Sequence, residues 1–329
     1  MPPKILIFGT GGVGAGYAYV LLRKLPSQNV VTVCRSNYDA ASQNGFTMDS
    51  TIWGNNLSFK PTVVRTVNDA VTLDNSVPFD YVVVTSKVLR AGLSNPELIK
   101  SAISRDTTIV LLQNGIGIED EYTSLYPDNP LLSAVVYFAV TQTSPAVLSH
   151  SEIELMHVGT YPANAPAPHK RAAESWVQLV TDCGATIKLH DDVQSERWAK
   201  LMLNAPINPL CALTRSRDTQ FLNSGDGTSD FIRDTIAEVL SVAHAYGYTQ
   251  LNQQRMDNVM YRMSNRAPPG VQPSMMADAL AHRNMEVDAI VGNVVRLAQQ
   301  KNVNVPILRT FYMLVRALDD SFTRSRRSA

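Results

Sequence analysis

The chain has 329 residues, of which 45% are hydrophobic and 18% are charged, and its 29 basic residues equal its 29 acidic ones. This composition supports sizeable folded cores, suits about two domains of ordinary size, and excludes global disorder. The balanced charge gives no electrostatic reason to expect nucleic acid or an anionic membrane as a partner.

Neither a targeting segment nor a membrane segment is expected. The first predicted strand begins within a few residues of Met1, which leaves no room for a signal peptide. No apolar run approaches the ~20 residues that a membrane helix needs. The three cysteines form no C-x-x-C pair and the six histidines show no zinc-like spacing. We therefore predict a cytoplasmic protein and propose no metal site.

A buried strand and a glycine-rich turn open the chain. The apolar run from Ile5 to Phe8 precedes glycines in the G-x-G-x-x-G spacing, and the residues from Tyr17 to Leu25 have helical composition. In this pattern the first glycine permits a tight turn, the second lets the backbone approach a pyrophosphate, and the third lets the helix pack on the strand. The helix N-terminus offers amide groups and partial positive charge to phosphates. The sequence therefore predicts a dinucleotide site at Gly9, Gly11, Gly12, Val13 and Gly14.

Arg35 indicates which dinucleotide binds. It follows the second predicted strand, Val30 to Cys34. An NAD site usually has an acidic residue here for the ribose 2′-hydroxyl, whereas an arginine suits a 2′-phosphate through charge-assisted hydrogen bonds. A solvated surface arginine is the alternative interpretation. We predict NADP as the cofactor, used as NADPH.

The first half of the chain continues as an alternation of strand-like and helix-like segments. Further strands are expected at Tyr81–Thr85, Thr108–Leu112 and Leu132–Tyr137. Such alternation is typical of a parallel sheet with helices on both faces. Ligands of these sheets bind beyond the carboxyl ends of the strands, where Lys87 and Gln113-Asn114-Gly115 fall.

The second half favours helix. Four segments have helical composition: Gln194–Leu203, Phe231–Tyr246, Gln253–Met263 and Met275–Gln300. We therefore predict an α/β fold in which a Rossmann-type NADP-binding domain, residues 1–192, precedes a mostly α-helical substrate domain, residues 193–329. The polar run 223–230 is expected to be an exposed loop. A frayed, solvated tail is expected at Arg324, Arg326 and Arg327.

Three polar side chains recur on one predicted helix. Lys200, Asn204 and Asn208 are successive i, i+4 positions, so a continuing helix places them along one face. The residues between them are mostly apolar, and a lysine and two amides are costly to bury without partners. They therefore suit a polar cleft, and the solvated face of an amphipathic helix is the alternative. Pro206 predicts a kink, because its ring clashes with the carbonyl four residues back.

Several motifs follow one another in a characteristic order. After the glycine turn, Lys87 and Gln113-Asn114-Gly115 comes Arg197-Trp198-x-Lys200-x-x-x-Asn204-x-x-x-Asn208-Pro209-Leu210. It is followed by Ser274-Met275-x-x-Asp278-x-x-x-x-Arg283-x-x-Glu286-x-Asp288-x-Ile290-x-Gly292 and by Val303-Asn-Val-Pro306. The motif that contains Lys200 and the motif that begins at Ser274 are far more specific than the glycine turn. Together they resemble the ketopantoate reductase (2-dehydropantoate 2-reductase) family, from Lys4 to about Pro306.

The resemblance implies the reaction and the residues that perform it. The activity would be reduction of 2-dehydropantoate to pantoate by NADPH, a step of pantothenate and coenzyme A biosynthesis. Lys200 would be the general acid that gives a proton to the carbonyl oxygen, and Glu286 would hydrogen-bond the forming hydroxyl. Ketone reduction develops alkoxide charge, which a nearby ammonium stabilises and then protonates.

The resemblance also assigns binding residues. It implies that Asn204, Asn208 and Ser274 fix the carboxylate and hydroxyl groups of a small 2-oxo acid. Lys87 and Asn114 would lie at the nicotinamide, with Asn114 also beside the substrate. A homodimer formed through the helical domain is a further implication.

Alternatives remain open. Pro206, His150-Ser-Glu152 and the 223–230 run depart from the family's usual pattern, so another branched or aromatic 2-oxo acid is an alternative substrate. The β-hydroxyacid dehydrogenases share the two-domain plan and a Lys-x-x-x-Asn segment, but the chain lacks their Ser-Gly-Gly loop. An NADP-binding sensor would keep the fold without turnover. Exposed helix carboxylates are the alternative for Glu286 and the preferred interpretation of Asp278 and Asp288, with Arg283 pairing along its helix.

Overall fold

The computed structural model of the chain describes residues 1–73, 78–89 and 92–328. These residues form two compact units. The first runs from Met1 to Val193, except that a short segment beginning at Val88 and the segment Asn114–Gly117 belong to the second. The second unit otherwise comprises the residues from Gln194 onward. The two excepted segments bring residues of the sequence's first half into the helical unit.

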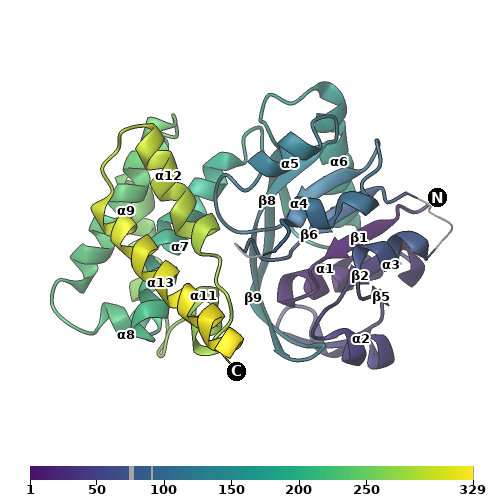
Figure 1. Cartoon of the computed structure of the whole chain (residues 1–329), viewed down its shortest axis with the longest axis horizontal. Helices are drawn as coiled ribbons and strands as arrows, with labels where there is room; N and C mark the ends of the chain where they lie inside the picture. The colour runs from purple at the N-terminus through teal and green to yellow at the C-terminus, as the bar shows by residue number, and fades with distance from the viewer. Residues whose placement is uncertain (74–77, 90–91, 329) are drawn as a thin grey trace. The chain divides into compact units, whose positions relative to one another are not determined.

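The strands of the first unit join into one sheet (Figure 1). They are β1 (Ile5–Phe8), β2 (Val30–Val33), β3 (Phe46–Ser50), β4 (Gly54–Phe59), β5 (Thr62–Val64), β6 (Tyr81–Val84), β7 (Thr108–Leu111), β8 (Leu131–Ser144), β9 (Val147–Thr160) and β10 (Ile187–Leu189). Their order is β4-β3-β9-β8-β7-β6-β1-β2-β5, with β10 beside β9. The run from β8 to β5 is parallel, whereas β8 pairs with β9 and β3 pairs with β4 in antiparallel fashion.

Helices cover this sheet, and the first strands are buried because of it. The helical segments are α1 (Gly12–Leu22), η1 (Ser27–Asn29), α2 (Tyr38–Asn44), α3 (Val67–Thr72), α4 (Asn95–Leu98), η2 (Lys100–Ala102), α5 (Asp120–Leu125) and α6 (Ala167–Asp182). All four residues of β1, β2 and β7 are buried. Near-continuous apolar strands of this kind are typical of parallel sheets covered on both faces. The Rossmann-type first domain predicted from the sequence is therefore confirmed in its fold class.

The second unit is helical. Its elements are α7 (Gln194–Thr214), α8 (Asp218–Leu222), α9 (Thr228–Ala245), α10 (Gln253–Ser264), α11 (Ser274–Leu280), the π-helical turn η3 (Asp288–Gly292), α12 (Asn293–Gln300) and α13 (Pro306–Ser328). Its core is one cluster of buried apolar residues that includes Trp198, Leu201 and Ile236. Among the described residues, no helix combines the length and the apolar character that crossing a membrane requires.

Two local expectations about the helices are corrected. The residues Met275–Gln300 do not form one helix, since α11 ends at Leu280 and helical structure resumes only near η3. The C-terminal arginines belong to α13 and not to a frayed tail, and Arg326 hydrogen-bonds the carbonyl of Phe322 and the side chain of Asn284. Pro206 lies inside α7, which continues to Thr214, and the kink expected at this proline stays a prediction.

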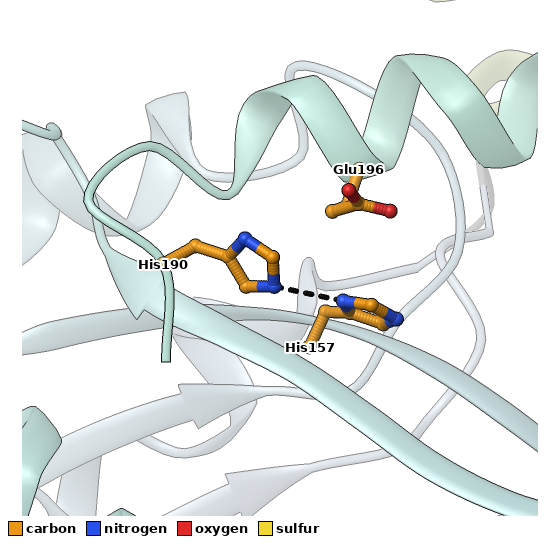
Figure 2. Close-up of side chains that lie close together, drawn as sticks. All are labelled: His157, His190 and Glu196. Atoms are coloured by element: carbon orange, nitrogen blue, oxygen red, sulfur yellow. Dashed lines mark hydrogen bonds between the residues drawn. The ribbon is translucent and has the colours of Figure 1, made fainter. Parts of the chain in front are cut away.

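Two histidines that are distant in the sequence meet in the first unit (Figure 2). Nδ1 of His157, on β9, lies 2.8 Å from Nε2 of His190, which follows β10. The backbone N–H of His190 also donates to the carbonyl of Val158. In this bond one of the two ring nitrogens carries the proton and donates it, and the other nitrogen accepts. Sequence spacing could not reveal this pair, because its members are 33 positions apart.

Candidate functional site

The glycine turn of the first unit has the shape that a dinucleotide requires. Gly9 adopts a φ of +99°, and a Cβ there would lie 2.4 Å from the backbone nitrogen of Ser86. A Cβ on Gly14 would lie 2.5 Å from the carbonyl oxygen of Gly9. A Cβ on Gly11 would have no atom within 4 Å. The outer glycines are thus required by packing, and the middle one borders open space.

The first turn of α1 begins beside this open space. Gly11 is the N-cap of α1, and no side chain caps this helix end. The first amide groups of an α-helix have no partner within the helix and carry partial positive charge. Gly12, Val13 and Gly14 lie in this turn, so the predicted cofactor residues are at a helix end of the kind to which anions bind.

The sheet topology independently identifies the same place. Along the chain, strands are added on one side of β1 as β2 and β5, and then on the other side as β6, β7 and β8. In open α/β sheets, ligands bind at such a reversal, beyond the carboxyl ends of the strands. Gly9 follows β1, and Ser86 and Lys87 follow β6. The amide of Gln113 donates to the Ser86 carbonyl at 2.6 Å, which ties the end of β7 to this edge.

Arg35 lies in the next loop of this edge. It is exposed, two residues after β2 ends. Asn37 is buried and donates from Nδ2 to the carbonyl of Thr10 at 2.7 Å, which joins the Arg35 loop to the glycine turn. Sequence analysis missed Asn37. An exposed guanidinium in a loop fixed to the glycine turn fits a 2′-phosphate of a dinucleotide bound there.

Lys200 is positioned within the second unit by Asn114. It lies on α7, is half-buried, and donates from Nζ to Oδ1 of Asn114 at 2.8 Å. The pKa of Lys200 is lowered from 10.5 to about 8, first by burial and then by the positive charge of Arg197, while the negative charge of Glu286 opposes both. A lysine with this pKa is mostly charged at neutral pH and releases its proton more readily than an ordinary lysine.

Glu286 is a buried carboxylate, and not an exposed one. Its side chain is 6% exposed, and Oε1 accepts a hydrogen bond from the backbone N–H of Val88 at 3.2 Å. The interpretation of Asp278 as an exposed carboxylate was wrong, because that side chain is buried and accepts from Arg283. Asp288 is also not exposed, because it is half-buried and accepts from the hydroxyl of Tyr312. Among these acids, Glu286 is the one whose charge acts on Lys200.

The remaining predicted substrate residues lie on α7 and α11. Asn204 is half-buried and Asn208 is buried, about one and two helical turns beyond Lys200. Ser274 is exposed and is the first residue of α11, which packs against α7. Within the described chain, no hydrogen bond links Ser274 to another predicted site residue. The structure therefore brings Lys200, Asn114 and Glu286 together, and places both asparagines along the same helix.

Sequence analysis missed the groups that hold Asn114. Arg197, on α7, donates to the carbonyl of Gly115, and Asn293 donates to the carbonyl of Ile116. The spacing of Arg197 and Lys200, i and i+3 on a helix, could have indicated a common face. For Asn293 the sequence offers no signal, because its partner is 177 residues away.

Comparison with known proteins identifies the relatives of this chain. The family model described as "Ketopantoate reductase PanE/ApbA" matches residues 5–163, and its C-terminal counterpart matches residues 192–319. A 2-dehydropantoate 2-reductase from Nostoc is 26% identical over 96% of this chain and 95% of its own length. The crystal structure of a 2-dehydropantoate 2-reductase from Methylococcus capsulatus is 28% identical, covers 97% of each chain, and superposes with a TM-score of 0.82.

A second solved structure has a different activity in its name. A D-mandelate dehydrogenase, solved with NADH and anilino(oxo)acetate, superposes with a TM-score of 0.81 over 97% of this chain and 99% of its own, at 19% identity. At this identity the likeness shows a common fold. The two family models and the reductase relatives show that the chain belongs to the ketopantoate reductase family of NADP-dependent oxidoreductases that act on a CH–OH group.

Proposed function

We propose that the protein reduces 2-dehydropantoate to pantoate with NADPH, and that Lys200 is the proton donor. The observation that carries this proposal is the contact of the Lys200 ammonium with Asn114 in the presence of the buried Glu286 carboxylate. Partial burial of a charged lysine costs free energy. Titratable groups with such shifted pKa values cluster at functional sites, which supports a catalytic role for Lys200.

The residues supply distinct parts of the chemistry. Bound NADPH supplies the hydride that adds to the ketone carbon. The Lys200 ammonium stabilises the negative charge that develops on the oxygen and then transfers its proton there, which leaves a neutral amine and a hydroxyl. The Glu286 carboxylate favours the charged form of Lys200 before transfer. Asn204, Asn208 and Ser274 can orient the substrate's carboxylate with groups that do not titrate.

Turnover across a panel of 2-oxo acids tests this function. We expect NADPH oxidation, followed by absorbance, with the highest kcat/KM for 2-dehydropantoate. A higher value for an aromatic 2-oxo acid would move the assignment to another reductase of the same family. Oxidation of 3-hydroxy acids by NADP, with no reduction of 2-oxo acids, would favour a β-hydroxyacid dehydrogenase. Nucleotide binding without any turnover would identify a sensor.

Cofactor preference is expected to depend on Arg35. We expect Arg35→Ala to lower kcat/KM for NADPH by about 10-fold to 100-fold, because a hydrogen bond to a charged group contributes about 1.5–3 kcal/mol. The value for NADH should change little, since NADH has no 2′-phosphate. Arg105→Ala is the matched control, because Arg105 is an exposed arginine just before β7, at the opposite end of the strands. A native enzyme that prefers NADH, or a preference that survives the substitution, would contradict this assignment.

The rate of reduction is expected to fall with rising pH. Lys200 must carry its proton to act as an acid, and its pKa of about 8 places the loss of that proton above neutrality. We therefore expect kcat for reduction to be constant near pH 7 and to decline about tenfold per pH unit well above 8. The reverse oxidation needs the neutral amine, so its kcat should rise over the same range. Parallel profiles in the two directions would argue against Lys200 as the titrating group.

A further inference from the structure

The segment Asn114–Gly117 is held at successive backbone groups within the second unit. Nη1 of Arg197 donates to the carbonyl of Gly115 at 3.0 Å. The N–H of Ile116 donates to the carbonyl of Ala289 at 3.1 Å, and Nδ2 of Asn293 donates to the carbonyl of Ile116 at 2.6 Å. Three bonds from three elements therefore restrain two residues of this segment.

The two side chains that hold this segment belong to Arg197 and Asn293, and together we call them the clamp. Both are buried. Arg197 is 2% exposed and Asn293 is 7% exposed. Burying a guanidinium is expensive even with hydrogen bonds, and this one stands three residues from Lys200 on α7, with a charge of the same sign. A stable helix does not need this arrangement. The position of Arg197 is therefore better explained by what it holds.

Asn114 connects the clamp to the chemistry. Its Oδ1 accepts the hydrogen bond from Lys200, and the restrained Gly115 is its neighbour in the chain. A hydrogen bond fixes a flexible lysine only as well as its acceptor is fixed, and small misplacements of a reacting group cost large factors in rate. Without these two side chains, the segment that carries Asn114 would keep the Ile116–Ala289 backbone bond and the packing of Ile116 but would lose two of its three hydrogen bonds.

We propose that Arg197 and Asn293 are positioning residues that clamp the Asn114–Gly117 segment, so that Asn114 holds the Lys200 ammonium in one orientation. Neither residue needs to contact substrate or cofactor for this role. The inference rests on the proposed function in one respect, which is that Lys200 is the proton donor.

Three variants and one control test the clamp in the full-length protein. Arg197→Met removes the charge and the hydrogen bond, Arg197→Lys keeps the charge but loses the guanidinium fork, and Asn293→Ala removes the second bond. Arg262→Met is the control, because Arg262 is an exposed arginine on α10 of the same unit. For each protein, kcat and KM are measured across pH, together with thermal unfolding. The rate at which an amine-reactive reagent modifies Lys200 is followed against pH by peptide mass spectrometry.

We expect all three variants to lower kcat by on the order of 10-fold to 100-fold while KM for NADPH stays native, as for a misplaced catalytic group. Arg197→Met should also move the pH midpoint of Lys200 modification upward, because a positive charge that disfavoured the ammonium is gone. Arg197→Lys and Asn293→Ala should move this midpoint less than Arg197→Met. The control should match the native protein in every measurement.

Two results would overturn the clamp. One is a folded Arg197→Met with native kcat and a native profile of Lys200 modification. The other is a loss of kcat only in those variants that thermal unfolding shows to be unfolded, together with a native profile of Lys200 modification in every variant that folds. The proposed function can fail separately: if the native protein reduces no 2-oxo acid, modification of Lys200 still reports whether Arg197 and Asn293 control its environment.

Discussion

Replacement of Lys200 by alanine should lower kcat for 2-oxo acid reduction by about 10²–10⁴-fold, the usual contribution of general acid catalysis. The variant retains the glycine turn and Arg35, which belong to the first unit, so the dissociation constant of NADPH should change little. Both quantities can be measured on one preparation, by absorbance for turnover and by titration of cofactor fluorescence for binding.

Lys301→Ala is the matched control for this substitution. Lys301 follows α12 in the same unit, where its ammonium lies 4.9 Å from the centroid of the Tyr246 ring, and its loss should leave kcat near native. Lys87 is the alternative proton donor. If Lys87→Ala lost turnover while Lys200→Ala stayed near native, the acid would belong to the first unit. The mechanism proposed for Lys200 would then be wrong, although the ketopantoate assignment could survive.

Replacement of Gly115 by alanine should damage both stability and turnover. Gly115 has a φ of +101°, and a Cβ there would lie 2.2 Å from the carbonyl oxygen of Ala289. The backbone strain alone costs about 1–3 kcal/mol, and relieving the clash must move the segment that carries Asn114. We expect the free energy of unfolding in urea to fall by at least this strain. Because Asn114 moves, kcat should fall by on the order of 10²-fold in the fraction that remains folded.

Gly227→Ala separates the contact from the strain. Gly227 also has a left-handed backbone, with a φ of +81°, but a Cβ there would meet no atom within 4 Å. Its substitution should cost stability through the backbone alone and leave kcat per folded molecule unchanged. Equal kcat in the two variants would show that Asn114 does not depend on the close packing of Gly115 against Ala289.

Local patterns predicted the start of the first unit well. The strands Ile5–Phe8 and Thr108–Leu111 and the glycine turn each depend on a short run of neighbouring residues, and the apolar runs of the two strands indicate directly that they are buried. The strand of Leu132–Tyr137 was found only in part, because β8 continues to Ser144 and its last four residues are all polar. The partner strand β9 was missed, since its polar residues include His150 and Glu154 and its apolar content is diluted.

In the candidate site too, the sequence revealed some features and the tertiary structure revealed others. The sequence by itself determined the family, the fold class and the identity of the polar residues on α7, because the i, i+4 spacing and the ordered motifs are local properties of the chain. Only the tertiary structure decided that Asn114 joins Lys200, that Glu286 is buried beside a charge of opposite sign, and that Arg197 and Asn293 hold the segment between them. These contacts join residues 82 to 177 positions apart. They depend on how helices and loops pack, and no periodicity in a single sequence encodes that packing.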